Sequence, residues 1–212
     1  MKKIITSILV ISAISLSYTS FGQNDPNAKK VLDKVSTTIK SIPALSASFT
    51  YTTTDRNKNK KGTVNGTLYV KGNKFYIKQA GNEIFSNGSK TWNYNGDDEV
   101  TVQDVDASDD NSLTPQKFLS DFYDKDFTYK LMSSAGDSYE IQLIPVDKRK
   151  NFKQVNIFVN KSKNLITKAR ILDKSDNTIE FALSNINTNA SLPDSKFVFD
   201  VSKHPGVEVV AQ

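Results

Sequence analysis

The stretch DPNAKKVLDKVSTTIKSIPALSASFTYTTT, residues 25–54, decides the fold because the period of its apolar residues changes within it. Asp25 followed by Pro26 is typical of a helix N-cap and first helical residue, and the helix must end before Pro43. Between these signals the apolar residues recur at steps of three and four, which predicts an amphipathic helix of about four turns. They are Ala28, Val31, Leu32, Val35 and Ile39.

The second half of the stretch has a period of two. Its apolar residues are Leu45, Ala47, Phe49 and Tyr51, and the polar residues between them are Ser46, Ser48, Thr50 and Thr52. Successive side chains of a strand point to opposite faces, so this alternation predicts a long strand with one buried face. A helix followed directly by a strand therefore opens the domain.

Strand patterns continue along the rest of the chain, separated by turn residues such as Asn87-Gly88 and Asn95-Gly96-Asp97. They cover residues 62–71, 74–79, 83–86, 90–94, 99–103, 127–132, 139–144, 153–160, 165–172 and 178–186. We expect a mainly β protein of the α+β class, with an antiparallel meander of about ten or eleven strands. A sheet this large curls or splits, so we expect a curved sheet with a trough on its inner face.

One interruption of the strands predicts a second helix. Thr114-Pro115 resembles an N-cap with proline in the first turn, and Phe118, Leu119 and Phe122 would form its apolar stripe. Two helices of unequal length would then be available to cover the concave face.

The N-terminal 22 residues have the composition of a cleaved signal peptide. A short basic segment precedes a mostly apolar run of about a dozen residues, which is too short to span a bilayer. Ser20 and Gly22 occupy the small-residue positions before a cut at Gln23. We therefore expect residues 23–212 to form a single exported domain.

The composition excludes several classes of site. The 212 residues include no cysteine and one histidine, so a disulfide scaffold, a Cys-ligated metal and a thiol nucleophile are ruled out. His204 lies in a terminal turn, where we expect a surface residue rather than a general base. The net charge of +5 is spread along the chain, which argues against nucleic-acid binding. We expect no enzymatic activity, no metal and no cofactor.

Three charged runs are candidate sites. Residues 104–112 imitate a calcium loop, but Asp109 replaces the required glycine and Pro115 the required glutamate. The acidic residues 97–99 could supply the carboxylate pair of a glycoside hydrolase, although their place in a hairpin turn favours a role in solubility. The basic run of residues 56–61 is interpreted as a solvated hairpin tip, with docking on an anionic membrane or partner as the alternative.

Several segments, in the right order over nearly all of residues 23–212, resemble the LolA family of periplasmic lipoprotein carriers. They are Val31–Val35 with Ser46–Thr50, Gly66–Lys71 with Phe75, Asn87–Tyr94, Thr114-Pro115 with Phe118-Leu119, and Phe197–Phe199 with Pro205–Val209. The resemblance implies an incomplete, strongly curved antiparallel β-barrel whose concave face is lidded by helices and receives the acyl chains of lipoproteins.

The resemblance also implies partners. The family takes acylated lipoproteins from an inner-membrane, ATP-driven transporter and passes them to an outer-membrane receptor. One departure concerns the lid. Family members commonly carry an Arg-Pro pair whose arginine holds the lid shut, whereas this chain reads Lys71-Gly72, so Lys71 is at best a weaker substitute. A periplasmic lipid- or lipoprotein-sensing domain of an envelope stress pathway is the alternative function.

Strand parity and the second helix supply the candidate residues of an acyl-chain cavity, for which an ordinary packed core is the competing interpretation. They are Phe49, Tyr51, Leu68, Val70, Phe75, Ile77, Trp92, Tyr94, Phe118, Leu119, Phe122, Ile141 and Leu143. Phe75 and Lys71 are also expected to contact a partner protein. We expect the carrier to be a monomer.

Overall fold

The computed structural model describes residues 24–105 and 123–212 of the chain. The predicted signal peptide, residues 1–22, and the predicted lid residues Phe118, Leu119 and Phe122 lie outside the described residues. Within the described ranges, no helix combines the length and the apolar character needed to cross a membrane.

Helix α1 (Pro26–Ser41) begins at Asp25, as predicted. One carboxylate oxygen of Asp25 accepts hydrogen bonds from the backbone N–H groups of Asn27 and Ala28, at 2.8 Å and 3.5 Å. The other accepts the N–H of Leu131, at 3.0 Å, in strand β7 (Phe127–Ser133). The hydrogen bond from Leu131 is the main reason that the pKa of Asp25 lies below its ordinary value. One side chain therefore both caps α1 and ties it to the sheet.

Twelve strands form a single sheet. Besides β7 they are β1 (Leu45–Thr54), β2 (Lys60–Lys71), β3 (Lys74–Gln79), β4 (Asn82–Ser86), β5 (Lys90–Tyr94), β6 (Glu99–Asp104), β8 (Ser138–Pro145), β9 (Phe152–Asn160), β10 (Leu165–Asp173), β11 (Thr178–Asn187) and β12 (Glu208–Ala211). Short helical turns lie at α3 (Tyr123–Asp126), η1 (Asp194–Phe197) and η2 (Val201–Lys203). The bounds of the first eleven strands agree with the sequence prediction to within two residues, and β12 was not predicted.

The strand order is β12-β6-β5-β4-β3-β2-β1-β11-β10-β9-β8-β7. The expected single meander is wrong in one respect: the sheet consists of two meanders, β1–β6 and β7–β11, joined where β11 pairs with β1. The last strand, β12, adds to β6 in the parallel direction. Both joins pair segments far apart in the sequence, which local periodicity does not reveal.

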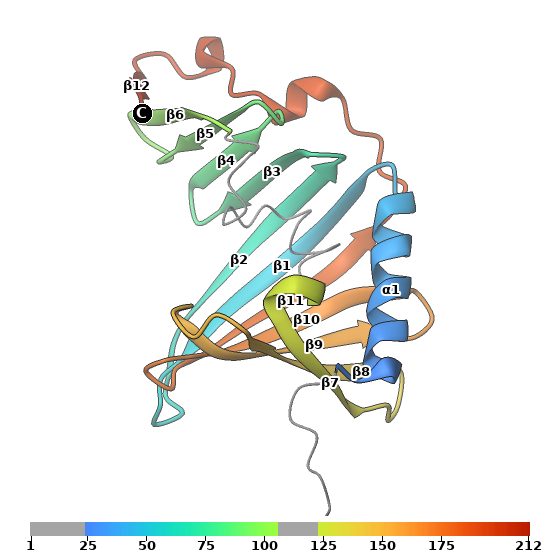
Figure 1. The fold of residues 1–212 in the computed structure, drawn as a ribbon. Coiled ribbons are helices and arrows are strands. Elements are labelled where there is room, and N and C mark those ends of the chain that lie inside the picture. The colour runs from blue at the N-terminus through green and yellow to red at the C-terminus, as the bar shows by residue number, and fades with distance from the viewer. Residues whose placement is uncertain (1–23, 106–122) are drawn as a thin grey trace, which may run out of the picture.

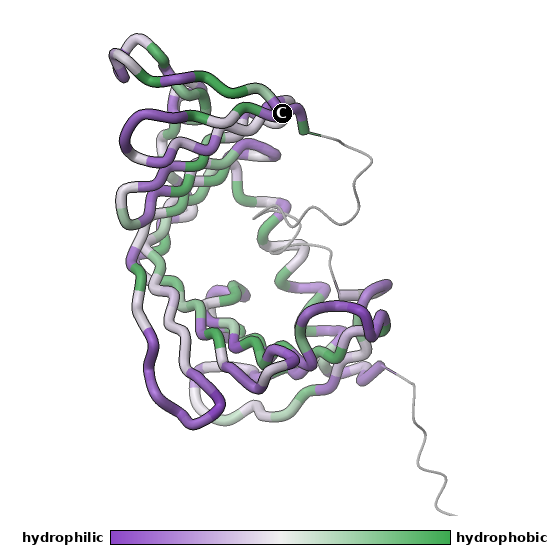
Figure 2. The backbone as a smooth tube through the Cα atoms, turned by 90° about the vertical axis from the view of Figure 1, so that its left-hand side faces the viewer, coloured by the Kyte–Doolittle hydropathy of each residue, from purple (hydrophilic) through white to green (hydrophobic). Residues whose placement is uncertain are grey.

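The sheet curls into an open half-barrel, and α1 lies on its concave side, packed on β7 and β10 (Figure 1). Figure 2, turned by a quarter, shows the same curve in profile. This arrangement confirms the expected fold class, a mainly β, strongly curved and incomplete barrel.

Two hydrophobic cores form on opposite faces of the sheet. The first lies between α1 and the concave face of β7–β10, and it includes Leu32, Ile141, Leu143 and Ile157. The second lies on the convex face of β3–β6, where Tyr76, Phe85 and Val100 pack against Phe197 and Phe199. We call the chain between β11 and β12, residues 188–207, the C-terminal segment, because it covers the second core.

His204 is part of this covering and is half-buried. Its ring centroid lies 4.5 Å from that of Phe199 and 4.7 Å from that of Tyr94. The aromatic packing places the imidazole against the convex face, and the following residues continue into β12.

Candidate functional site

The concave face continues beyond the first core, across β11, β1, β2, β3 and β4. Directly paired residues share a face, so the register traces it: Tyr51 lies opposite Phe181, and Leu68 lies opposite both Ala47 and Ile77. The residues of this stretch belong to neither core, and we call them the apolar floor. The floor consists of Phe49, Tyr51, Leu68, Val70, Phe75, Ile77, Ile84, Ile179, Phe181 and Leu183.

Two aromatic rings form the centre of the floor. The rings of Phe49 and Phe181 stack with centroids 5.3 Å apart. Gly66 lies opposite Phe49, and a Cβ atom added to this glycine would be 2.3 Å from the Phe49 ring. Glycine at this position therefore lets the ring lie flat across β2, and Phe49 is only 5% exposed. The neighbouring Tyr51 is 37% exposed, so the aromatic surface opens to solvent toward the end of β1.

The floor offers apolar contact and little chemistry. The ten residues that define it carry one polar side-chain group, the hydroxyl of Tyr51, and the polar residues Thr53, Gln79 and Ser86 lie on the same face. Within residues 24–105 and 123–212, no group of three His, Asp or Glu side chains is placed to hold a metal ion. Such a surface suits a hydrocarbon ligand, because it can bind by burial of area without directional bonds.

A hydrogen-bonded cluster of titratable side chains lies on the other face of the sheet. The hydroxyl of Tyr76 donates to Glu83 at 2.6 Å, and the ammonium of Lys78 donates to the second oxygen at 2.7 Å. Burial is the main cause that raises the pKa of Tyr76 above its ordinary value. Each Glu83 oxygen accepts one of these hydrogen bonds, so the cluster joins β3 to β4 and stabilises this hairpin.

The structure divides the ten predicted cavity residues that it describes into three groups. Six of them, Phe49, Tyr51, Leu68, Val70, Phe75 and Ile77, lie together in the floor. Ile141 and Leu143 share the concave face, but both are fully buried in the first core.

Trp92 and Tyr94 require a correction, because they lie on the convex face. Trp92 pairs with Phe85 of the second core, and Trp92 and Tyr94 both pack against this core beneath the C-terminal segment. They cannot share a surface with Phe49. Strand parity alone could not distinguish the two faces of β5, since each carries alternate residues of the strand.

Lys71 binds the C-terminal segment. Its ammonium donates to the carbonyl of Leu192 at 3.0 Å and to the carboxylate of Asp194 at 2.9 Å, and Lys74 pairs with the second oxygen of Asp194. The hydrogen bonds from Lys71 and Lys74 lower the pKa of Asp194 to about 2. The proposed partner contact through Lys71 must therefore compete with this bond.

Four floor residues were not predicted: Ile84, Ile179, Phe181 and Leu183. The last three alternate within a segment that was predicted as a strand, so their shared face was visible. What was missing was the pairing of β11 with β1, which brings Phe181 beside Tyr51. This pairing spans more than a hundred residues of sequence.

The open, curled half-barrel with α1 on its concave side is a LolA-like fold. The chain belongs to the LolA family: the family model "Outer membrane lipoprotein carrier protein LolA" matches residues 40–200. No curated protein sequence matches the chain.

The chain is similar to several solved structures at low sequence identity. A conserved, uncharacterized protein of Thermus thermophilus aligns with a TM-score of 0.60 and 10% identity, over 88% of this chain and 99% of that chain. A LolA superfamily protein of Nitrosomonas europaea aligns at 0.43 with 14% identity, over 82% and 98%. A putative outer membrane lipoprotein-sorting protein domain of Vibrio parahaemolyticus aligns at 0.42 with 10% identity, over 79% and 94%.

Proposed function

We propose that this protein is a periplasmic carrier that holds the acyl chains of lipoproteins on the apolar floor and moves them from the inner to the outer membrane. The observation that carries the proposal is the floor itself: a continuous apolar face that belongs to neither core, with Tyr51 partly open to solvent. Family membership supports the same function.

The energetics of the cargo favour such a surface. Burying one methylene group gains about 0.8 kcal/mol. Exposing an acyl chain of about sixteen carbons to water therefore costs roughly 12 kcal/mol relative to burying it. A lipoprotein therefore needs a carrier to cross an aqueous compartment. The carrier must release its cargo as well, and a floor that supplies contact without covalent or metal bonds allows reversible binding.

The cycle has two further parts. The carrier receives lipoproteins from an inner-membrane ATP-driven transporter and delivers them to an outer-membrane receptor. It acts as a monomer, without a cofactor and without an enzymatic step. Phe75, at the side of the floor nearest Ser86, is the residue that we expect to touch a partner protein.

A displacement assay tests binding at the floor. Residues 23–212 are titrated with a fluorescent fatty acid, which a triacylated lipopeptide should displace. Tyr51→Glu places a charge on the floor, and we expect it to weaken probe binding at least tenfold, which corresponds to about 1.4 kcal/mol. Thr52→Glu is the matched control, because it adds the same charge one residue away on the convex face.

Two outcomes contradict binding at the floor. The first is that the wild-type protein binds no probe. The second is that Tyr51→Glu and Thr52→Glu weaken probe binding equally, because the effect of the charge would then not depend on the face of the sheet that carries it. In cells, depletion of a carrier strands lipoproteins in the inner membrane. Depletion of a sensor instead changes transcription and leaves their location intact, so localisation separates these two functions.

A further inference from the structure

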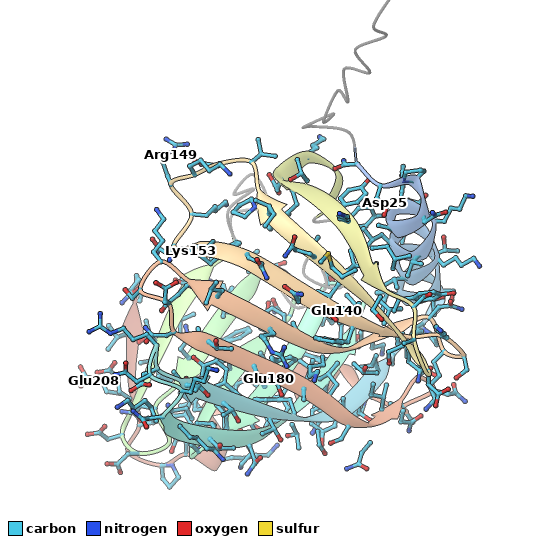
Figure 3. The ribbon with its side chains drawn as sticks, turned by 90° about the horizontal axis from the view of Figure 1, so that it is seen from below. Asp25, Glu140, Arg149, Lys153, Glu180 and Glu208 are labelled. Carbon is cyan, nitrogen blue, oxygen red and sulfur yellow. The ribbon has the colours of Figure 1, made fainter. Side chains whose placement is uncertain are left out.

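Three connections gather at one end of the sheet. The β10–β11 tip contacts the β8–β9 connection, because the N–H of Lys174 donates to the carbonyl of Asn151 at 3.3 Å. The β1–β2 tip is their neighbour, since Thr54 pairs with Thr178 at the start of β11. Figure 1 shows the three connections at the lower left, and Figure 3 labels Arg149 and Lys153 on the same side. We call residues 55–61, 146–153 and 173–177 the basic rim.

The basic rim has nine basic and four acidic residues. Its net charge of five positive charges equals that of the whole chain, so the remaining residues sum to zero. The charge is thus concentrated by the fold, although it is spread along the sequence. The basic members are Arg56, Lys58, Lys60, Lys61, Lys148, Arg149, Lys150, Lys153 and Lys174.

The four acidic residues of the rim are occupied in shaping its turns. Asp55 accepts the backbone N–H groups of Asn57 and Asn59, and Asp173 accepts those of Ser175 and Asn177. Asp147 binds the side chain of its neighbour Arg149, and Asp176 binds Lys153. Six basic side chains of the rim then have no carboxylate partner among the described residues: Arg56, Lys58, Lys60, Lys148, Lys150 and Lys174.

The character of these cations fits a diffuse anionic surface. Seven of the nine are lysines, which act as mobile point charges, and one of the two arginines is already bound to Asp147. Val146 lies among them and is 57% exposed, which provides an apolar side chain that can enter the boundary between headgroups and acyl chains. A rigid acidic partner would instead favour fixed bidentate arginines.

We infer that the basic rim docks the protein on the surface of an anionic phospholipid bilayer, with Val146 at the point of contact. The rim does not overlap the apolar floor, so docking is independent of acyl-chain binding. It lies at the end of β1 where Tyr51 opens the floor to solvent, and docking there brings the floor close to a membrane. Salt should weaken docking, because it screens the attraction between the basic rim and the anionic bilayer.

Vesicle sedimentation tests this inference with residues 23–212. Wild-type protein should bind vesicles that contain phosphatidylglycerol, should bind phosphatidylcholine vesicles much more weakly, and should dissociate as salt is raised. The variant Arg56→Gln/Lys58→Gln/Lys60→Gln should bind about 100-fold more weakly, at about fivefold per charge. The control Lys30→Gln/Lys34→Gln/Lys163→Gln removes the same charge from exposed residues away from the rim and should lose less than about fivefold.

The apolar contact has its own readout. Val146→Trp should tighten binding to the phosphatidylglycerol vesicles and shift the emission of the new tryptophan to shorter wavelength, because indole favours the membrane interface. Emission that stays unchanged on vesicle binding places residue 146 away from the membrane and overturns its assigned role.

Three results would overturn docking itself. The first is equal binding to both kinds of vesicle, and the second is an equal loss in the rim and control variants. The third is binding to soluble polyglutamate but not to vesicles, which assigns the rim to an acidic protein. Fatty-acid probe binding without vesicles should be unchanged in the rim variant, so failure of docking and failure of the proposed carrier function are distinguishable.

Discussion

Gly66 allows a sharp test of how the floor is built. A Cβ atom at this position would lie 2.3 Å from the Phe49 ring and 2.4 Å from the carbonyl oxygen of Lys78, so Gly66→Ala must displace one or both. Overpacking of this kind costs about 2 kcal/mol. For a chain of this length, that lowers the melting temperature by roughly 4–8 °C.

The same strand provides the control. Around Gly62, also in β2, nothing lies within 4 Å of the corresponding Cβ position. Gly62→Ala should therefore leave stability unchanged or raise it by up to about 1 kcal/mol, because alanine restricts the unfolded chain. Urea unfolding of both variants measures the difference directly.

A double-mutant cycle then isolates the ring. In a Phe49→Leu background the smaller side chain leaves more room, so Gly66→Ala should cost at least about 0.5 kcal/mol less than in the wild type. The contact with Lys78 remains in both backgrounds, so relief is partial. If Gly66→Ala is no more costly than Gly62→Ala, or if the cycle shows no coupling, the flat placement of Phe49 over Gly66 is wrong.

The remaining predictions concern the core, the helix cap and the C-terminal segment. Ile141→Ala should cost about 3 kcal/mol in urea unfolding, because the side chain is fully buried, and should leave fatty-acid affinity unchanged; reduced affinity at full stability would return Ile141 to the ligand site. Asp25→Ala should cost about 1–2 kcal/mol through the lost cap. Because the pKa of Asp25 is lowered on folding, its contribution is present above the unfolded pKa of about 4 and fades as pH falls, a slope that Asp25→Asn should lack. Asp194 has a pKa of about 2, so its pairs with Lys71 and Lys74 hold the C-terminal segment above the unfolded pKa of about 4 and weaken as pH falls toward 2. Limited proteolysis of the wild-type protein should show increasing cleavage within residues 188–207 as the pH falls across that range. If Asp194→Asn shows the same cleavage pattern as the wild type, these pairs do not hold the segment.

Much of the candidate site was predictable from local patterns. The alternation in residues 45–54 correctly placed Phe49 and Tyr51 on one face, and the same reasoning placed Leu68 and Ile77. It failed for Trp92 and Tyr94. Alternation separates the residues of one strand into two faces, but it does not show which of these faces lies on the same side of the sheet as a given face of a distant strand. That assignment depends on the cross-strand register.

The sequence by itself determined the elements: the cap at Asp25, the length of α1 and the bounds of eleven strands to within two residues. These follow from periodicity and turn chemistry, which act over a few neighbouring residues. Only the tertiary structure decided which apolar residues are covered. Ile141 and Tyr51 alternate alike in their strands, yet α1 buries the first completely and leaves the second 37% exposed. Coverage depends on where α1 and the C-terminal segment pack, and on the pairing of β1 with β11, which are contacts between residues distant in the chain.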